Sequence, residues 1–296
     1  MSPKTFVPRR AVTKSVVIAS ALTALTALAG SRTAVAAENR TIKVGVLQWE
    51  DTTATSRVTT HLLERFGYKI EETGLLDWGV AFEGLANGDF SIMTSQTDYV
   101  THDYWSRFDK KLEKVSAVSF GLYQGIVVPD YVPITSIDQL NQYKDKLGGK
   151  IIGIEPGSGL MRQTHNVVKA YGLTLDLIDG STPAMTAAVK SAIAKKEWIA
   201  ATLWRPSWMV QRFPVRFLAD PKNIQEPNQA YQWIAKKGFC EEYPKARQII
   251  ASVFLPIEGI TQITVWENDG LSLEDAIVKW EKENKDRIDR WATIGI

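Results

Sequence analysis

The chain has 296 residues, 45% of them hydrophobic and 23% charged, a composition typical of one large globular domain or of two lobes. Five of the 35 basic residues and no acidic ones lie in the first 37 residues, so the remainder has 30 basic against 33 acidic side chains, a net charge of about −3. No basic surplus is left to indicate a nucleic-acid partner. Ten Trp is a high number, and we expect most of them in the core.

The first 37 residues read as a signal peptide that is removed. A basic stretch (Lys4, Arg9, Arg10 and Lys14) precedes an apolar run from Val16 to Ala29. That run has 14 residues, fewer than the about 20 that span a bilayer, which argues against a membrane anchor. Ala34-Val35-Ala36 then places small residues where a signal peptidase cleaves.

The export route stays open between Sec and twin-arginine. Arg9-Arg10 loosely resembles a twin-arginine signal, but Val12 and Thr13 stand where that signal prefers Phe and Leu. No Cys lies near the cleavage site, which excludes a lipoprotein anchor. An exported protein without an anchor suits a Gram-negative periplasm.

Cys240 is the only cysteine, so an internal disulfide is impossible. A single Cys is more often a small buried apolar side chain than a nucleophile.

The first half of the mature chain alternates strands and helices. We expect strands at 42–47, 68–71 and 90–93, with helices between them from about 51 to 66 and from 80 to 87. Gly67 and the stretch Asn87-Gly88-Asp89 mark the helix ends. This alternation predicts an α/β lobe with a mostly parallel sheet.

A second series begins after the strand 125–129. It comprises a helix start at 134–140, a strand at 150–154, helices at about 160–171 and 183–195, and a strand at 198–203. A strand at 231–235 returns to the first lobe and a helical C-terminus follows. The sequence therefore predicts a two-lobed α/β fold: residues 38–129 plus 230–296 form lobe 1, and residues 130–229 form lobe 2.

Ligands of open α/β sheets bind beyond the carboxyl ends of the strands, which face the interlobe cleft in a two-lobed protein. Trp49 and Asp51 follow the first strand, where a ring and a carboxylate make a plausible cation site. The competing interpretation is that Asp51 or Thr52 is simply the helix N-cap. Trp78 follows the second strand, and Tyr99 lies in the polar stretch after the third.

Two further strand ends belong to the second lobe. The sequence Glu155-Pro156-Gly157-Ser158-Gly159 precedes a helix and is able to dock a ligand carboxylate, although an ordinary glycine-containing helix start explains it equally well. Trp204-Arg205-Pro206-Ser207-Trp208 follows the last strand of this lobe, and at least one of its two rings is expected to pack in the core.

Together these positions describe a cleft with aromatic rings from both lobes. A quaternary ammonium donates no conventional N–H hydrogen bond, so aromatic faces are its natural receptor, at about 0.5–2 kcal/mol per contact. Several such faces with one anionic contact support micromolar binding, about −8 kcal/mol.

Five motifs in the same order resemble the choline-binding branch of the glycine betaine/choline substrate-binding family. They are Trp49-Glu50-Asp51-Thr52-Thr53-Ala54-Thr55, Gly84-Leu85-Ala86-Asn87-Gly88-Asp89, Lys150-Ile151-Ile152-Gly153-Ile154-Glu155-Pro156-Gly157, Trp204-Arg205-Pro206-Ser207-Trp208-Met209 and Lys237-Gly238-Phe239. The resemblance covers essentially the whole mature chain. It implies a type II periplasmic-binding-protein fold, an interlobe ligand cleft and delivery of the solute to an ABC permease in the inner membrane.

The resemblance also implies roles for particular residues. Trp49 and Asp51 would face the cation or a hydroxyl, Trp204 would form a wall of the cage, and Ser158 would contact the polar end of the ligand. Members of the family usually carry Trp-Pro after the third strand, where this chain has Gln96-Thr97-Asp98. Trp78, Tyr99 or Tyr123 would have to replace the missing wall.

Another difference lies in the Trp204 motif. Some betaine-binding members have His where this chain has Ser207. The ligand could therefore be a different small cationic or zwitterionic solute.

An enzyme and a sensory protein are the two alternatives to a transport function. An enzyme is disfavoured because His61, His102 and His165 are scattered, and Gly157-Ser158-Gly159 lacks the nucleophile-elbow pattern. No catalytic residue, metal or cofactor is therefore predicted. A sensory protein that presents its closed form to a receptor uses the same closure, so the sequence does not separate it from a transporter. A monomer is expected.

Overall fold

The computed structural model describes residues 41–225 and 229–294, all within one compact unit, Asn39–Ile296. The predicted signal peptide of residues 1–37 lies outside the described residues. Within them, nine strands form one mixed sheet in the order β2-β1-β3-β9-β4-β7-β5-β6, with β8 paired to β4. The strands are β1 (Thr41–Leu47), β2 (Lys69–Leu75), β3 (Ile92–Ser95), β4 (Leu112–Pro129), β5 (Lys150–Ile152), β6 (Asp176–Ile178), β7 (Ala201–Arg205), β8 (Val215–Phe217) and β9 (Gln229–Lys236).

The helices fall into three groups along the chain. The first group is α1 (Glu50–Arg65), α2 (Trp78–Asn87) and α3 (His102–Phe108). The second is the 3-10 helix η1 (Ile137–Tyr143), α4 (Gly159–Tyr171), α5 (Thr182–Lys195) and α6 (Trp208–Arg212). The C-terminal group is α7 (Phe239–Glu242), α8 (Pro244–Ser252), α9 (Ile257–Asn268), α10 (Leu273–Glu283) and α11 (Lys285–Ile294).

Local sequence signals explain the buried face and the end of α1 and the start of α2. In α1, Val58, Leu62 and Leu63 recur at helical spacing and are buried. Gly67 follows with φ of 85°, a conformation that favours glycine. Asp77 caps α2 by accepting a hydrogen bond from the Val80 N–H at 3.0 Å.

The sheet is parallel at its edges and antiparallel at its centre. β1 pairs in parallel with β2 and β3, and β5 pairs in parallel with β6 and β7. The central pairs β3–β9, β9–β4 and β4–β7 are antiparallel. The prediction of a mostly parallel sheet is therefore wrong at the centre, because β9 returns directly between β3 and β4 instead of arriving through a helical crossover.

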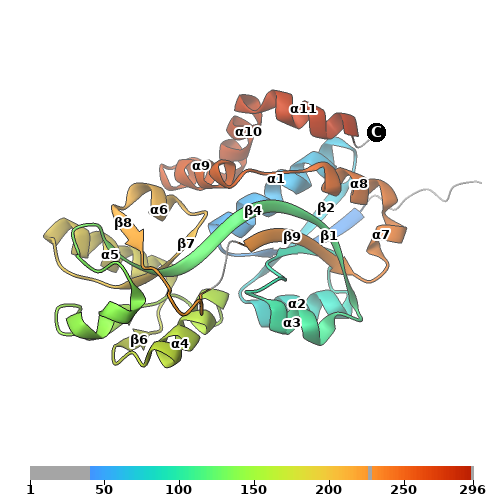
Figure 1. Cartoon of the computed structure of the whole chain (residues 1–296). Coiled ribbons are helices and arrows are strands. Elements are labelled where there is room, and N and C mark those ends of the chain that lie inside the picture. The colour runs from blue at the N-terminus through green and yellow to red at the C-terminus, as the bar shows by residue number, and fades with distance from the viewer. Residues whose placement is uncertain (1–40, 226–228, 295–296) are drawn as a thin grey trace, which may run out of the picture. The chain divides into compact units, whose positions relative to one another are not determined.

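β4 belongs to both halves of the sheet. This 18-residue strand pairs with β9 between Leu112 and Leu122 and with β7 from Tyr123 to Val127. Figure 1 shows it as the long green strand that runs from one half of the molecule to the other. We call the half with β1–β3, β9 and the start of β4 the first lobe, and the half with β5–β8 and the end of β4 the second lobe. The residue boundaries expected from the sequence stay a prediction.

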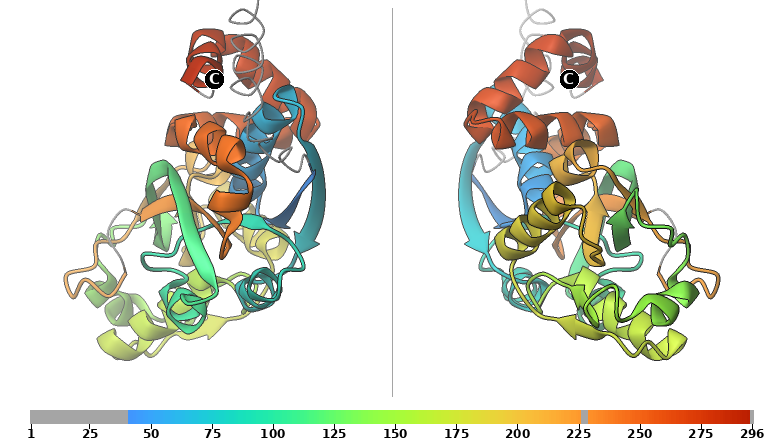
Figure 2. Two further views of the ribbon diagram at one scale, coloured as in Figure 1. Left: turned by 90° about the vertical axis from the view of Figure 1, so that its right-hand side faces the viewer. Right: turned by 90° about the vertical axis from the view of Figure 1, so that its left-hand side faces the viewer.

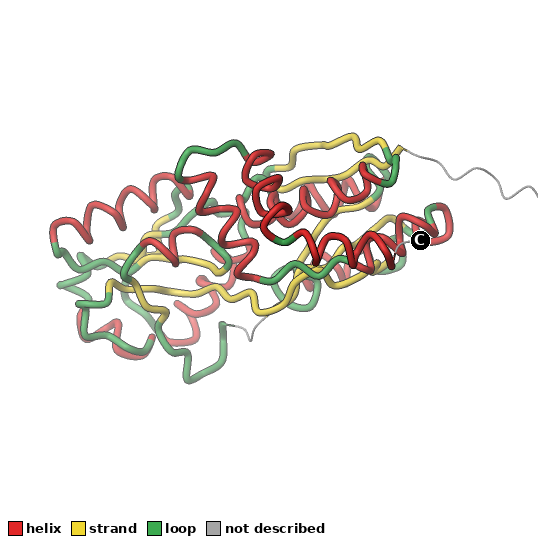
Figure 3. The backbone as a smooth tube through the Cα atoms, turned by 90° about the horizontal axis from the view of Figure 1, so that it is seen from above, coloured by secondary structure: helices red, strands yellow, loops and turns green. Residues whose placement is uncertain are grey.

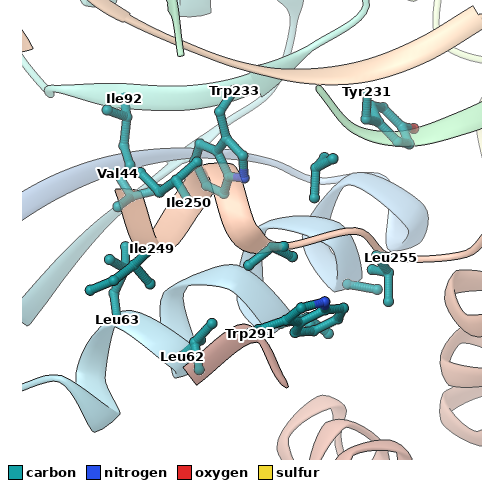
Figure 4. Close-up of a cluster of buried hydrophobic side chains, with 14 of the residues drawn as sticks. Val44, Leu62, Leu63, Ile92, Tyr231, Trp233, Ile249, Ile250, Leu255 and Trp291 are labelled. Atoms are coloured by element: carbon teal, nitrogen blue, oxygen red, sulfur yellow. The ribbon is translucent and has the colours of Figure 1, made fainter. Parts of the chain in front are cut away.

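The first lobe has a core on each face of its strands. On one face, α1 and α8–α11 pack in a cluster that includes Leu63, Trp233, Ile250 and Trp291 (Figure 4). On the other face, α2 and α3 cover Phe82, Phe90 and neighbouring side chains. The two side views show the C-terminal helices and α2–α3 on opposite sides of these strands (Figure 2).

The second lobe is built the same way on a smaller scale. One cluster holds Ile126, Ile137 and Leu140, and the other holds Met161, Met185 and Leu203. Figure 3 shows helices and strands in both halves of the chain. Each lobe therefore has its own core, and the lobes share β4.

None of the helices in the described part of the chain is, by itself, long and apolar enough to cross a membrane. Pro244–Ser252 and Ile257–Asn268 pass that test only as a pair, and they are bent by 89° at the break between them.

Candidate functional site

A cavity lies between the two lobes, with about 470 Å³ of empty space that is partly open to solvent. Both lobes and the strands that join them contribute to its lining. The rings around it are Trp49, Trp78, Tyr123, Trp204 and Tyr231, and the amides are Gln96, Gln124 and Gln229. Six of the eight residues expected from the sequence line this cavity: Trp49, Asp51, Trp78, Tyr123, Ser158 and Trp204.

Asp51 is the buried carboxylate of the cavity. It lies in the first turn of α1, and its Oδ2 accepts a hydrogen bond from the hydroxyl of Tyr231 on β9. Its Oδ1 is buried and makes no hydrogen bond of good geometry in the described residues, although the Trp204 side chain is close enough to lower the pKa of Asp51. Burial raises the pKa of Asp51 to about 6, although the hydrogen bond from Tyr231 and backbone N–H groups lower it. Asp51 is thus mostly ionised at neutral pH.

The N-cap interpretation of this turn is wrong for both residues considered. The N-cap of α1 is Trp49, which makes no side-chain capping bond. The Thr52 hydroxyl instead donates to the backbone carbonyl of Trp49 at 2.7 Å. Thr53 also donates to that carbonyl, at 2.9 Å. These bonds hold the turn that presents Trp49 and Asp51 to the cavity.

Tyr231 completes the polar side of the cavity. It is fully buried and belongs to the core cluster of the first lobe (Figure 4). Burial and the adjacent Asp51 carboxylate hold the pKa of Tyr231 well above its usual value, so the hydroxyl stays protonated and donates. The sequence pattern predicts only that this residue lies in a strand. The only clue in the sequence is that a Tyr in a buried strand generally requires a hydrogen-bond partner for its hydroxyl.

Trp49 and Trp78 pack on each other, with ring centroids 5.6 Å apart and planes inclined by 31°. A methylated ammonium between two rings requires about 3.5–4 Å of van der Waals contact to each ring, so these two rings are too close to hold one between them. Trp78 is only 3% exposed and belongs to the core that α2 covers. It supports Trp49 from behind.

Trp204 forms the wall from the second lobe. It lies near the end of β7, is 7% exposed, and pairs across the sheet with Gln124 of β4. The indole Nε1 of Trp49 is buried without a hydrogen-bond partner in the described residues, whereas the Trp204 side chain is close enough to Asp51 to lower its pKa. Tyr123 packs edge-on against Phe217, with centroids 5.0 Å apart.

The structure does not bring Tyr99 and Trp208 to this cavity. Tyr99 is 40% exposed and lines a separate groove together with His102 and Arg162. Trp208 begins α6 and packs edge-on against Phe213 in the second lobe, with centroids 5.4 Å apart. It follows a strand end, as expected, but its ring packs in the second lobe and its side chain hydrogen-bonds Glu50 of the first lobe.

Ser158 has two roles. Its hydroxyl caps α4 by accepting from the Met161 N–H at 3.2 Å, as the ordinary helix-start interpretation predicts. It also lines the cavity at 3% exposure. Glu155, earlier in the same turn, does not reach the cavity lining, because its carboxylate accepts from the backbone N–H and hydroxyl of Thr182 at 2.8 and 2.9 Å.

The lobes touch on both sides of the cavity. Arg162 of α4 donates to the backbone carbonyl of Val100 at 2.6 Å, and Gly159 packs directly against the Val100 side chain. On the other side, Ser207 donates to Glu50 Oε1 at 2.9 Å. Burial and the neighbouring Asp51 raise the pKa of Glu50 to about 7. The structure is therefore that of a closed form.

No cluster of three or more His, Cys, Asp or Glu side chains with metal-binding geometry occurs within 41–225 and 229–294.

Comparison with known proteins places the chain in a family. Residues 40–283 match the family described as "Substrate binding domain of ABC-type glycine betaine transport system". The chain belongs to this family. The resemblance expected from the sequence motifs is confirmed.

Individual relatives support the assignment. The glycine betaine/carnitine transport binding protein of Listeria monocytogenes is 35% identical over 150 residues, which is half of each chain. The Escherichia coli glycine betaine/proline betaine-binding periplasmic protein is 25% identical over 276 residues, covering 79% of this chain and 83% of that one.

Solved structures agree on the fold. The lactococcal OpuAC domain, closed on glycine betaine, superposes with a TM-score of 0.79 at 26% identity, covering 85% of this chain and 99% of that one. A choline-binding protein in complex with choline gives 0.77 at 23% identity, covering 86% and 92%. The two-lobed type II periplasmic-binding-protein fold is thereby confirmed.

Proposed function

We propose that this chain is the periplasmic solute-binding component of an ABC importer, closing its two lobes over a small methylated ammonium solute of the glycine betaine or choline type. The observation that carries the proposal is the cavity itself, where the buried carboxylate of Asp51 lies among aromatic rings from both lobes. A permanent cation suits such a site because ring faces and a carboxylate both stabilise positive charge without accepting a proton.

The family and the relatives support the transport role. Family members are substrate-binding domains of ABC-type transport systems, so an ABC permease in the inner membrane is the partner that we propose. The Escherichia coli and Dickeya dadantii relatives are periplasmic proteins, which supports export of this chain. The proposed binding component acts as a monomer.

The proposal is tested by calorimetric titration of the mature chain with glycine betaine, choline, carnitine and proline betaine, each separately. We expect micromolar binding of at least one, corresponding to about −8 kcal/mol. Absence of heat with all four, in a protein whose circular dichroism shows it to be folded, would contradict the proposed solute class.

Affinity for a cation should fall as the pH is lowered from 7 to 5. The pKa of Asp51 is raised to about 6, so its carboxylate is mostly ionised at pH 7 and mostly protonated at pH 5. If only the ionised form holds the cation, binding weakens roughly tenfold over this range. Because a bound cation lowers this pKa, binding near pH 6 also releases protons, which titrations in buffers of different ionisation enthalpy measure.

The matched control is Asp51→Asn. This variant should bind the cation more weakly at pH 7 and lose most of the pH dependence. Glu50 also titrates with a pKa raised to about 7 at the interlobe contact, so Glu50→Gln is examined in parallel. An unchanged pH profile in Asp51→Asn would mean that Asp51 is not the group that meets the cation.

A further inference from the structure

The two lobes carry opposite net charges. Residues 130–225, which form most of the second lobe, hold 12 basic and 8 acidic side chains, a net charge of +4. The described residues 41–129 and 229–294 hold 17 basic and 23 acidic side chains, a net charge of −6. Opposite charges attract each other more strongly as the distance between them falls. The charge distribution therefore favours approach of the lobes.

The ion pairs across the cleft repeat this polarity. Among the described residues three ion pairs join the lobes, and in each of them the second lobe supplies Arg and the first lobe supplies the carboxylate. They are Arg162–Asp103 at 3.8 Å, Arg205–Glu258 at 3.4 Å and Arg212–Asp269. The first pair lies beside the contact of Arg162 with Val100, and the other two lie where the end of β7 and α6 meet α9 (Figure 1).

Arg162 also makes two uncharged contacts with the first lobe. Its guanidinium donates to the backbone carbonyl of Val100 at 2.6 Å and lies over the ring of Tyr104, 4.9 Å from the ring centroid. Tyr104 stacks on Phe82 in the core that α2 and α3 cover. A planar guanidinium makes such a hydrogen bond and such a stacking contact at once, so Arg162 joins the second lobe both to the cavity wall and to the core of the first.

The pairs at α9 are more exposed. The side chains of Arg205 and Glu258 are 50% and 75% exposed, and those of Arg212 and Asp269 are about half exposed. Each such pair contributes little by itself, and salt screens it. Three pairs of one polarity add up when a single movement of the lobes forms all of them.

We propose that Arg162, Arg205 and Arg212 form a charged clasp that holds the lobes closed over the solute, so that solute affinity falls as the ionic strength rises. The inference rests on the proposed function and adds a control of closure to it. Arg162 and Arg212 do not line the cavity, so they are positioning residues that prolong the closed state without touching the solute. Their loss raises the dissociation rate constant of the solute and leaves its association rate constant nearly unchanged.

The first test is calorimetry at pH 7 with whichever of glycine betaine, choline, carnitine and proline betaine binds most tightly. Between about 0.02 M and about 0.5 M NaCl, we expect the affinity of the unchanged protein to fall about fivefold, because screening weakens three pairs of ordinary strength. In Arg162→Glu/Arg212→Glu two of the interlobe contacts become repulsive. This variant should bind more weakly at low salt, and its affinity should rise with salt instead of falling.

A charge swap tests one contact by itself. Arg212→Glu should weaken binding about fivefold at low salt, and Arg212→Glu/Asp269→Arg, which restores opposite charges at the same place, should recover most of the loss. Stopped-flow measurements assign the change to dissociation. Arg216→Gln is the matched control, because Arg216 pairs with Asp130 within the second lobe at 3.7 Å and should not alter affinity. Thermal melts followed by circular dichroism verify that the variants fold.

The outcomes separate the clasp from the proposed function. Affinity that is independent of salt in the unchanged protein, or that falls equally with salt in Arg162→Glu/Arg212→Glu, would overturn the clasp and leave the proposed function intact. The same holds for an equal loss in Arg216→Gln, for absence of rescue by the charge swap, or for a change in the association rate constant alone. Failure of all four solutes to bind at every salt concentration would instead contradict the proposed function, and the inference with it.

Discussion

Replacement of Trp204 by Ala should weaken binding of the ammonium solute about 100-fold. Trp204 is the large ring that the second lobe contributes to the cavity, and it is 7% exposed. Its removal eliminates a cation–π contact and opens the site to water, which together account for roughly 2–3 kcal/mol. Calorimetry of Trp204→Ala and Trp204→Phe measures the loss, and the Phe variant should retain part of the affinity because it keeps a ring.

Trp208→Ala is the matched control for this experiment. Trp208 lies in the same sequence motif but outside the cavity lining, where it packs on Phe213 and its side chain hydrogen-bonds Glu50 at the interlobe contact, so any loss of affinity in this variant measures closure and not the cage. Its replacement should lower the free energy of unfolding, as truncation of a partly buried Trp does, without a comparable loss of affinity. Normal binding by Trp204→Ala, or an equal loss in both variants, would contradict the assignment of Trp204 to the cage.

Replacement of Gly159 by Ala should block closure of the lobes. A Cβ at Gly159 would lie 1.9 Å from Cγ1 of Val100, far inside van der Waals contact. Gly159 is the first residue of α4 in the second lobe and Val100 belongs to the first, so the overlap exists only when the lobes meet. Ala is a better helix former than Gly, so the variant should be as stable as the unchanged protein. We expect affinity to fall about 100-fold, because the closed state is penalised by several kcal/mol.

A second substitution should rescue this variant. In Val100→Ala/Gly159→Ala the offending methyl group is gone, and the remaining Cβ of residue 100 would lie 3.3 Å from the new Cβ, a contact that a small shift relieves. Affinity should return to within about tenfold of the unchanged protein. Calorimetry of the two single variants and the double variant measures this coupling. Additive losses, without rescue, would show that the Val100–Gly159 contact does not govern closure.

The first strand and helix, β1 and α1, could be predicted from the sequence. An apolar run ends at Leu47, a turn follows, and the spacing of Val58, Leu62 and Leu63 fixes the buried face of α1. These signals are local, so the positions of Trp49 and Asp51 at the end of β1 were predictable. The same logic placed Ser158 and Trp204 at the cavity.

Other elements have weak local signals. In β4 only residues 125–129 were predicted as a strand, because the earlier part contains Glu113, Lys114 and Ser116 and its pairing with β9 is broken by register shifts. α3 has seven residues and buries none of them, so it shows no apolar periodicity that a sequence could reveal.

The contacts that complete the site are between residues far apart in the chain. Asp51 and Tyr231 are 180 positions apart, and Val100 meets Gly159 only across the closed interlobe boundary. Ring use is equally non-local, since Trp204 near the end of β7 and Trp208 at the start of α6 belong to one sequence motif, but only Trp204 lines the cavity. A sequence indicates candidate rings; tertiary packing determines which of them meet a ligand.

The central claim is that this cavity recognises positive charge between aromatic faces and Asp51. It is tested most directly by titrating the mature chain with choline and with 3,3-dimethylbutan-1-ol, in which carbon replaces the charged nitrogen at the same shape. We predict micromolar binding of choline and binding at least about 100-fold weaker for the uncharged alcohol, since cation–π and carboxylate contacts both depend on the charge. Equal affinities for the two compounds would show that the site reads only apolar shape and would contradict the account.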